Sequence, residues 1–448
     1  MASDNKDPFS EPDFSEFADW HVEKQDESWP YFGEFEMDMT AEQERIIASN
    51  VSLLENRVDW NAKTTRFSRL IESISNDEER AKILKQFQIR FDKYEFNKAD
   101  FNGYSFPCVA SFSGAVFKDT TVNFHRAVFK ESVSFNGAKF INTPACFFGM
   151  TIQKGDFYFT NVHVENRVIN FFKAQFLGDI AEFNFMVLKK AGFSANEVKV
   201  TGHLFIKNTR FPCVANFRRL SVGGACDLSK NTFNKVPDFT SSIFDRPPDV
   251  SGMEVLAFKG RKVWKLWVCP FRKLKSNEGA KFRKLKAMAL AANDHEKDGE
   301  FFAYEMLAKR GHDEANKGRF ALFINWLYFT FSNFGQSYLR PLFALLLSYF
   351  AFAIYYATQV NPLLKSAEMN DFALGYSFRN VFPFLGSLFG AVFHPKEHKS
   401  RFEEIFEKLA PQRELVDWLV TVGFVQNAIG AVLLFLLLLG LRNKFRLK

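Results

Sequence analysis

Residues 99–140 read ADFNGYSFPCVASFSGAVFKDTTVNFHRAVFKESVSFNGAKF, and this stretch decides the fold. Phenylalanine returns after five to seven residues, with five from Phe112 to Phe117 and seven from Phe117 to Phe124. A small residue often stands two positions earlier, as Ala115 does before Phe117. This spacing matches neither the period of a helix nor that of a strand. It predicts a chain that turns a corner at each repeat, so that successive coils stack into a solenoid.

The same pattern runs from Phe96 to Phe244 and takes up many of the 57 phenylalanines in this chain of 448 residues. Its pairs of a small residue and a phenylalanine are Ala99/Phe101, Ala115/Phe117, Ala127/Phe129, Ala138/Phe140, Ala145/Phe147, Ala174/Phe176, Ala181/Phe183, Ala191/Phe193 and Ala215/Phe217. We expect these phenylalanines to point into the coil, where those of successive coils stack on one another.

The segments ADFNGYSF, GAVF, RAVF and GAKF resemble the motif of pentapeptide-repeat proteins, a central Leu or Phe with a small residue two positions before it. The resemblance implies a right-handed quadrilateral β-helix over residues 96–246, with extra residues on some faces. Residues 281–310 and the segment SNFGQSYLRPL (332–342) resemble the helical connector and membrane entry of membrane-anchored members. The expected fold class is mixed: this solenoid, flanking α-helices and a C-terminal α-helical transmembrane domain.

The formal net charge of +7 is unevenly distributed. Residues 1–45 carry fourteen acidic and three basic side chains, whereas residues 259–286 carry eleven basic and one acidic. Some soluble relatives of the repeat family mimic DNA with an acidic face, but residues 96–245 carry seventeen basic and eleven acidic side chains. A DNA mimic is therefore not expected. Nucleic acid is not expected as a partner either, because a membrane already accounts for the positive charge.

The N-terminal region divides into a tail and a cap. Residues 1–39 are acidic, contain interleaved aromatic residues and predict disorder; the alternative is a segment that docks onto a basic surface. Thr40 and Gln43 have capping-box spacing and predict a helix over 41–56, and a second helix is expected to start at Asp77. These helices are expected to cover the open end of the solenoid.

Two uncharged stretches predict membrane-spanning helices. They run over 20 residues from Pro341 to Val360 and over 23 residues from Leu419 to Leu441. Tyr355 with Tyr356, and Trp418, are expected in the interfacial belt. The basic connector and the basic C-terminal tail predict that both termini face the cytoplasm. The apolar segment 372–393 lies between the spans and is interpreted as re-entrant or interfacial, because a third span would separate the termini.

Two groups of residues are candidates for function. The basic set, Arg261, Lys262, Lys265, Arg272, Lys273 and Lys275, is expected to bind anionic lipid headgroups or a protein partner; the alternative is a solvated helix that closes the solenoid. The polar membrane set is Ser377, Arg379, Asn380, Gln426 and Asn427. These residues either line a pore or mediate helix packing in an oligomeric anchor.

Nothing in the sequence indicates catalysis, and neither a metal nor a cofactor is expected. Asp294, His295 and Glu296 are adjacent, so on a helix they project to different sides; we assign them a capping or packing role. The five cysteines are odd in number and lack CxxC spacing, which favours reduced thiols. The N-terminus has no signal-peptide pattern, so we expect it to stay in the cytosol.

The sequence thus predicts a bacterial inner-membrane protein whose cytoplasmic solenoid is an interaction or sensor scaffold. The alternative is an oligomeric ion channel, or a membrane-perturbing effector, gated by the solenoid. The expected partners are the lipid bilayer, an unidentified protein and further copies of the chain. The expected domains are a disordered tail (1–39), a helical cap (40–95), the repeat solenoid (96–246), a basic helical connector (249–340) and the transmembrane domain (341–448).

Overall fold

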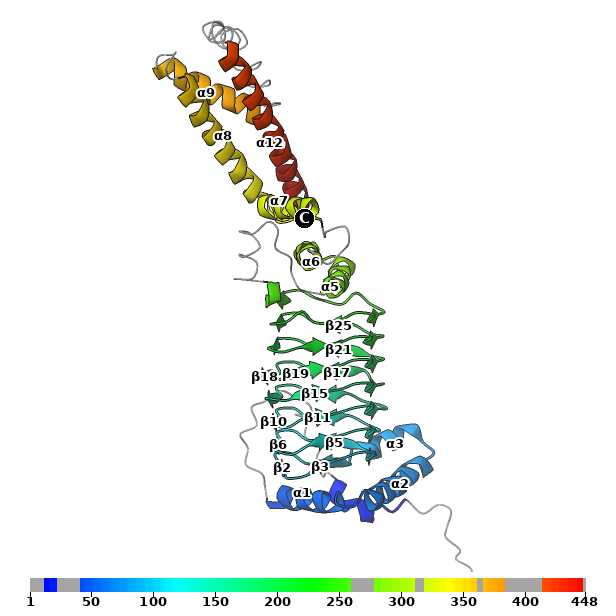
Figure 1. Ribbon diagram of the computed structural model, residues 1–448. Helices are drawn as coiled ribbons and strands as arrows, with labels where there is room; N and C mark the ends of the chain where they lie inside the picture. The colour runs from blue at the N-terminus through cyan, green and yellow to red at the C-terminus, as the bar shows by residue number, and fades with distance from the viewer. Residues whose placement is uncertain are drawn as a thin grey trace, which may run out of the picture. The chain divides into compact units, whose positions relative to one another are not determined.

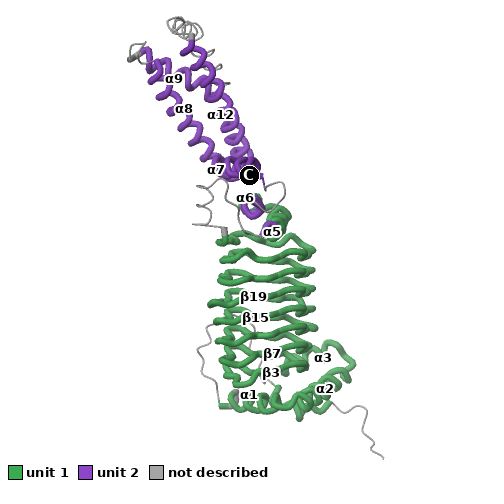
Figure 2. The backbone as a smooth tube through the Cα atoms, viewed as in Figure 1, with its two compact units in different colours: residues 1–259, 280–301 green, residues 260–279, 302–448 purple. Residues whose placement is uncertain are grey.

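The computed structural model describes residues 12–21, 41–258, 278–310, 318–360, 366–382 and 413–445 (Figure 1). They belong to two compact units (Figure 2). The first unit consists of residues 1–259 with 280–301, and the second of residues 260–279 with 302–448. Each unit is described by itself.

The first unit is built on a parallel β-solenoid of about seven turns, whose short strands form four sheets. The first sheet holds β1 (Gln88–Arg90), β5 (Val109–Ser111), β9 (Val133–Ser134), β13 (Phe157–Tyr158), β17 (Ile180–Glu182), β21 (His203–Phe205) and β25 (Cys226–Asp227). The second holds β2 (Glu95–Phe96), β6 (Val116–Lys118), β10 (Lys139–Ile141), β14 (His163–Glu165), β18 (Val187–Lys189), β22 (Arg210–Phe211), β26 (Thr232–Phe233) and β28 (Glu254–Val255). The third holds β3 (Ala99–Asp100), β7 (Val122–Asn123), β11 (Ala145–Cys146), β15 (Val168–Asn170), β19 (Gly192–Ser194) and β23 (Ala215–Asn216). The fourth holds β4 (Ser105–Phe106), β8 (Val128–Phe129), β12 (Thr151–Ile152), β16 (Gln175–Phe176), β20 (Lys199–Val200), β24 (Ser221–Val222) and β27 (Ile243–Phe244).

The corners of the solenoid explain the phenylalanine spacing. The amide of Tyr104 donates to the carbonyl of Phe101 at 3.1 Å, which closes a four-residue turn with Gly103 at a φ of +69°. The positive φ suits glycine, which has no Cβ. The last residue of the turn is the one that stands two before the next phenylalanine, Phe106. One corner and one short strand therefore take up about five residues.

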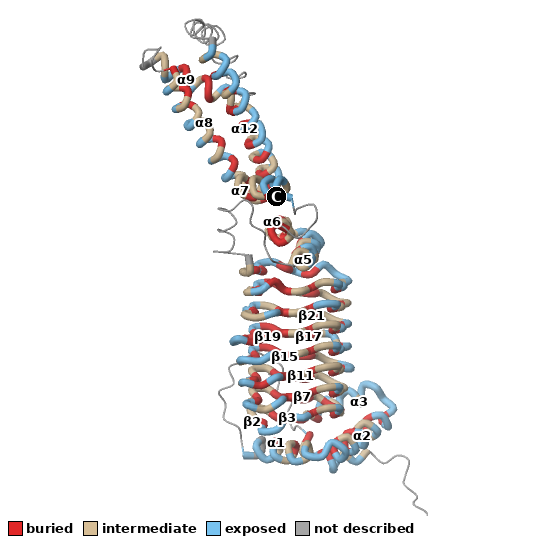
Figure 3. The backbone as a smooth tube through the Cα atoms, viewed as in Figure 1, coloured by how far each residue is buried: buried red, intermediate tan, exposed pale blue. Residues whose placement is uncertain are grey.

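Phenylalanines of successive coils stack face to face, as expected. The ring centroids of Phe106 and Phe129 are 4.5 Å apart with an interplanar angle of 6°, and those of Phe101 and Phe124 are also 4.5 Å apart. The alanines beside them are buried too, including Ala127. Buried positions recur along the coils of the solenoid (Figure 3). Such stacking adds about 0.5–1.5 kcal/mol per pair beyond the burial of apolar area. The prediction of a solenoid with flanking helices is confirmed.

A helical cap covers the first coil. It consists of α1 (Ala41–Leu53), α2 (Arg57–Ser73) and α3 (Asp77–Leu84). The indole of Trp60 on α2 donates to the carbonyl of Ser105 on the edge strand β4 at 2.7 Å, so the cap binds a group that the sheet leaves open. Helix α3 starts where the sequence predicts, with Asn76 as its N-cap. The sequence analysis did not identify α2 as a separate helix.

The prediction of a disordered tail is wrong for its described part. Residues Ser15–Trp20 form the 3-10 helix η1, and Phe17 and Trp20 are fully buried. The physical reason is that aromatic residues of the cap pack against them. The composition of the tail does not contain this information, because the cap residues lie elsewhere in the sequence.

The other end of the solenoid continues into η2 (Leu256–Phe258), α5 (Gly279–Ala291) and α6 (His295–Lys309). The ammonium group of Lys284 on α5 donates to the carbonyl of Ser242 at 2.6 Å, which ties α5 to the last coil. The carboxylate of Asp294 accepts from the amide of Lys297 at 3.0 Å, which is a helix-capping contact of the expected kind.

The second unit contains α7 (Arg319–Ser332), α8 (Leu339–Val360), α9 (Ser366–Val381) and α12 (Arg413–Phe445). Helices α8 and α12 are long and apolar enough to cross a membrane. Helix α9 packs against both of them. Its first half lies with Val360 of α8 and Leu419 of α12, and its last residue, Val381, lies with Leu345 and Leu433.

Helix α9 covers the first part of the segment interpreted as re-entrant or interfacial, whereas residues 383–393 lie outside the described part. Its contacts run antiparallel to α8, from the level of Val360 to the level of Leu345. Helix α12 then begins again near Val360. The start of α9 and the start of α12 therefore lie at the same end of the bundle, the end at which α8 finishes.

Candidate functional site

A buried polar cluster lies where α8, α9 and α12 meet. The side-chain amide of Gln426 donates to the hydroxyl of Ser377 at 2.8 Å and to its carbonyl at 3.2 Å. The phenol of Tyr356 donates to the amide oxygen of Gln426 at 2.8 Å, and the Ser377 hydroxyl donates to the carbonyl of Tyr349 at 2.7 Å. All three helices thus contribute to one hydrogen-bonded network, and Ser377, Gln426 and Tyr356 are 0% exposed.

Two glycines of α12 allow α9 to approach this closely. A Cβ on Gly423 would lie 2.6 Å from the phenolic oxygen of Tyr376. A Cβ on Gly430 would lie 2.7 Å from the carbonyl oxygen of Val381. Gly423 thus makes room for side chains of α9 and Gly430 for its backbone. Small residues that allow such close approach are common where helices pack in membranes.

The structure brings together only part of the polar membrane set. Ser377 and Gln426 hydrogen-bond directly, and Asn380 lies beside them, with its amide nitrogen 2.9 Å from the position of a Cβ on Gly423. Arg379 is exposed on α9, and Asn427 is half-buried. The network contains neutral groups, so its chemistry is that of packing and orientation rather than proton transfer.

The tyrosines of this cluster were not among the candidate site residues predicted from the sequence. Tyr356 was expected in the interfacial belt but is fully buried against Gln426. Tyr355 accepts a hydrogen bond of 2.6 Å from the indole of Trp418, so the two other expected belt residues do contact each other. Adjacent tyrosines on a helix face different directions, which separates these two roles.

The basic set lies outside the described residues. Arg261, Lys262, Lys265, Arg272, Lys273 and Lys275 all belong to the range 259–277. Their binding to anionic lipid or to a protein partner stays a prediction.

A second candidate site is the aromatic groove of the N-terminal cap. Its floor is formed by Trp60, Phe67 and Phe87, and η1 lies on it. The ring of Phe17 is 5.0 Å from that of Phe67, and the ring of Trp20 is 5.8 Å from that of Trp60. Phe14 completes the contact, with its ring 5.2 Å from that of Phe87.

Charged groups surround this aromatic contact. The ammonium group of Lys63 lies 4.9 Å from the ring centroid of Trp20, a cation–π distance. Burial lowers the pKa of Lys63, and the carboxylates of Asp19 and Glu16 oppose that shift. Arg66 binds Glu16 with its Nη2 atom 2.5 Å from Oε1, and this hydrogen bond lowers the pKa of Glu16.

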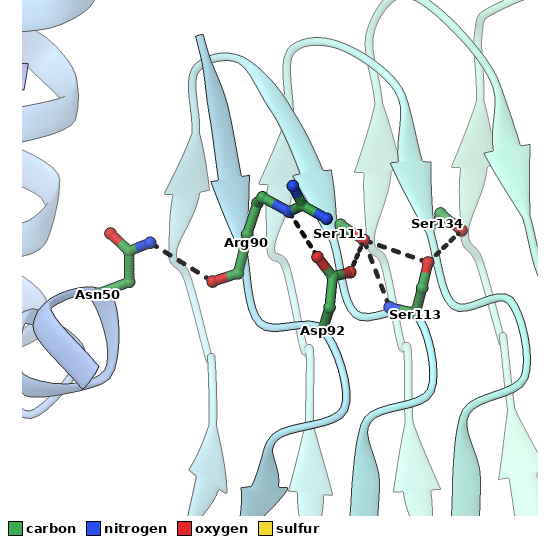
Figure 4. A network of polar contacts seen from close by, with 6 residues as sticks. All are labelled: Asn50, Arg90, Asp92, Ser111, Ser113 and Ser134. Carbon is green, nitrogen blue, oxygen red and sulfur yellow. Dashed lines mark hydrogen bonds and ion pairs between the residues drawn. The ribbon is translucent and has the colours of Figure 1, made fainter. Parts of the chain in front are cut away.

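A chain of hydrogen bonds continues from the groove into the solenoid (Figure 4). The indole of Trp20 donates to the Asn50 side chain at 3.0 Å, and Asn50 donates to the carbonyl of Arg90 at 3.4 Å. Arg90 pairs with Asp92 at 2.6 Å, and Asp92 accepts from the hydroxyl of Ser111. The network then passes through Ser113 to Ser134, with contacts of 3.1 Å each. One connected chain of polar contacts thus joins the groove, the cap and the first coils.

One wall of the solenoid carries an open hollow of about 920 Å³, lined by Asp119, Thr120, Thr121, Asn142, Pro144, Asn166 and Arg167. Asp119, Asn142 and Asn166 form a ladder on one corner, with contacts of 3.1 and 2.8 Å between neighbours. Each rung binds the next, so the ladder serves the stacking of coils. Across the described ranges, no group of three or more acidic, His or Cys side chains could hold a metal ion. Burial raises the pKa of the thiols of Cys108 and Cys226, which keeps them protonated.

Comparison of this chain with protein-family models, with curated proteins and with solved structures finds no match in any of the three.

Proposed function

We propose that this protein is a membrane-anchored pentapeptide-repeat solenoid that acts as an interaction scaffold. The observation that best supports the membrane anchor is how apolar and polar side chains are distributed over α8, α9 and α12. Phe343 and Phe424 are 70% and 77% exposed, whereas Gln426 and Ser377 are fully buried. Apolar groups outside and polar groups inside suit a bilayer, because lipid cannot satisfy hydrogen bonds. Only 22% of each apolar window is buried, which supports a helix surface that faces lipid.

The charges at the two ends of this bundle support an orientation. Asn443 of α12 donates to the carbonyl of Gly335 just before α8 at 2.9 Å, so the end of α12 and the start of α8 lie together. Basic residues gather at this end: Arg340, Arg442 and Lys444. Acidic residues gather at the opposite end: Glu368, Asp371, Glu414 and Asp417. By the positive-inside rule, both termini face the cytoplasm of a bacterial inner membrane.

The corner turns and the four sheets support the pentapeptide-repeat assignment. The coil is longer than four strict pentapeptides, because Phe106 pairs with Phe129, 23 positions later. A solenoid of this kind is stiff and offers extended surfaces, which is the physical basis for a scaffold. We propose that anionic lipid at the basic segment and further copies of the chain complete the assembly.

A channel is the second candidate, and Arg379 favours it. This side chain is exposed on α9, two positions after the buried Ser377, in the bundle that we assign to the membrane. A charged group at that depth is costly in lipid, so it needs an aqueous path or a neighbouring copy. The channel reading therefore requires an oligomer whose interior includes α9.

Membrane extraction and cysteine labelling test the anchor. The protein is expected to stay in the membrane pellet after alkaline carbonate treatment. In a variant whose native cysteines are replaced, Phe445→Cys should react with an impermeant maleimide only in inverted vesicles, and Trp418→Cys only in right-side-out cells. Release by carbonate, or equal labelling from both sides, would refute the anchor.

Ion flux from reconstituted liposomes tests the channel. The wild type should conduct if the channel reading holds, and Arg379→Leu should change the ion selectivity, whereas Gln426→Leu should lower the yield of folded protein. If no ion flux is seen under any condition, the channel is refuted and the scaffold function stands.

A further inference from the structure

The segment on the cap has a three-residue sequence period. Residues 14–20 read FSEFADW, in which an aromatic, a small and an acidic residue alternate. Three residues per turn of a 3-10 helix place each kind on its own face. The side chains follow this arrangement, with a backbone kink at Phe17 (φ −108°, ψ 19°): the rings of Phe17 and Trp20 are buried, Ala18 is exposed, and Glu16 and Asp19 bind Arg66 and Ser49 at 2.5 and 2.8 Å.

The cap that carries the groove is bound to the first coil of the solenoid by contacts that do not involve this segment. Trp60 binds the carbonyl of Ser105, and the phenol of Tyr104 donates to the carbonyl of Leu54 at 2.7 Å. Asn61 donates to the carbonyl of Gly103 at 3.2 Å. None of these bonds involves residues 13–21. The aromatic floor is therefore held in place by the cap and the first coil.

The segment itself is held mainly by side chains. Between its backbone and the cap, a single isolated bridge pairs His21 with Phe87. The 19 residues 22–40 separate it from α1. A fully extended chain of 19 residues measures about 60 Å, so covalent linkage alone does not hold the segment on the cap. In its bonding the segment resembles a bound peptide more than a structural element.

We propose that this groove is a docking site for an acidic aromatic segment of a partner protein, and that residues 13–21 fill it until such a segment displaces them. The partner segment carries aromatics three residues apart, each followed two positions later by a carboxylate. Those carboxylates match Arg66 and the Ser49 hydroxyl, while Lys63 faces the aromatic rings. This proposal rests on the scaffold function, for which it supplies a contact surface.

Peptide binding to the full-length protein in detergent tests the proposal. The probe is a fluorescent peptide of residues 12–21, and its binding is measured by anisotropy. The chain's own segment competes with the probe within the same molecule, so the wild type should bind weakly. The double variant Phe17→Ser/Trp20→Ser frees the groove and should bind at least tenfold more tightly. The control Ala18→Ser changes the exposed face and should bind as weakly as the wild type.

A second measurement uses the unmodified protein, because the double variant could disturb the cap. Hydrogen exchange followed by mass spectrometry should show faster exchange in residues 13–21 than in α2, and saturating peptide should accelerate it further. Protection of the segment equal to that of α2, with no response to peptide, would overturn the proposal. So would a double variant whose α2 stays protected while it gains no affinity for the peptide.

Two further outcomes are informative. If the double variant forms a dimer with wild-type chains that the peptide dissociates, the occupant is a second copy and the assignment to a partner protein is overturned. If the peptide does not bind to a protein that still resists carbonate extraction, the docking proposal is refuted and the proposed membrane anchor is unaffected.

Discussion

The side-chain amide of Gln426 on α12 donates to the hydroxyl of Ser377 on α9 at 2.8 Å, in a place where both residues are fully buried. The first residue belongs to a helix long enough to span a membrane, and the second to a shorter helix beside it. A hydrogen bond between two helices favours the register in which donor and acceptor meet, and in a bilayer the lipid would offer the amide no replacement partner. The bond gives a partner to an amide that is fully buried in the uncharged stretch of α12.

Replacing Gln426 with Leu should loosen the bundle. The substitution leaves Tyr356 and Ser377 without their shared partner, and polar contacts between membrane helices contribute about 1 kcal/mol. We expect Gln426→Leu to unfold at a lower SDS fraction in micelles, followed by helical circular dichroism. Asn427→Leu is the matched control, since this neighbour is half-buried and its change should be close to neutral. Equal effects of the two variants would argue against the network.

Gly430 offers a test in which two effects oppose each other. Alanine is favoured over glycine within a helix by about 1 kcal/mol, so Gly430→Ala would stabilise α12 if space allowed. The new Cβ would lie 2.7 Å from the backbone carbonyl of Val381, and backbone yields less easily than a side chain. We therefore expect a lower unfolding midpoint in SDS. Gly318→Ala is the control because nothing lies within 4 Å of its Cβ position, and it should be tolerated.

A charge inside the phenylalanine stack should unfold the solenoid. Phe129→Asp removes a ring that stacks on Phe106 and buries a carboxylate with no partner. The loss of a buried ring alone costs about 3–5 kcal/mol, and the unpaired charge adds to it. The expected result is loss of the β signal in circular dichroism and rapid proteolysis of the repeat. The control Ile243→Asp lies on a strand of the same sheet but is 63% exposed, and it should remain folded.

The period of the phenylalanines predicted the solenoid because it follows from local geometry. Several corners are closed by a bond between residues three apart, such as Phe101 and Tyr104, so a short stretch of sequence contains the rule for these turns. Apolar length predicted the two candidate spans for the same reason. Features that depend on neighbouring residues in sequence are those that a single sequence can supply.

The docking of η1 and the burial of Tyr356 could not be predicted in this way. Trp20 is buried because Trp60 and Phe67, forty or more positions later, form a groove for it. The composition of the tail is polar and acidic on average, and this average does not tell that Phe14, Phe17 and Trp20 pack against the cap. The three-residue period of FSEFADW was the available signal. In the second unit, Ser377 and Gln426 were named as candidates, but their pairing depends on how α9 packs.

Glu131 predicts a pH dependence of solenoid stability. It lies at a corner with Cys108 and Lys154 of the neighbouring coils, and burial raises its pKa, an effect that Lys154 partly opposes. In the unfolded chain this carboxyl loses its proton at a lower pH than in the folded chain. Its contribution to stability is therefore fully present below the ordinary pKa of glutamate and is lost as pH rises through the folded value.

The variant Glu131→Gln keeps the shape of the side chain and removes this ionisation. We expect its urea midpoint in detergent to exceed that of the wild type at pH 7 and to match it at pH 4, with the β signal of circular dichroism as the readout. Glu95→Gln serves as the exposed control and should show no such difference between the two pH values. A variant less stable than the wild type at pH 7 would mean that the ionised carboxylate stabilises the fold through Lys154.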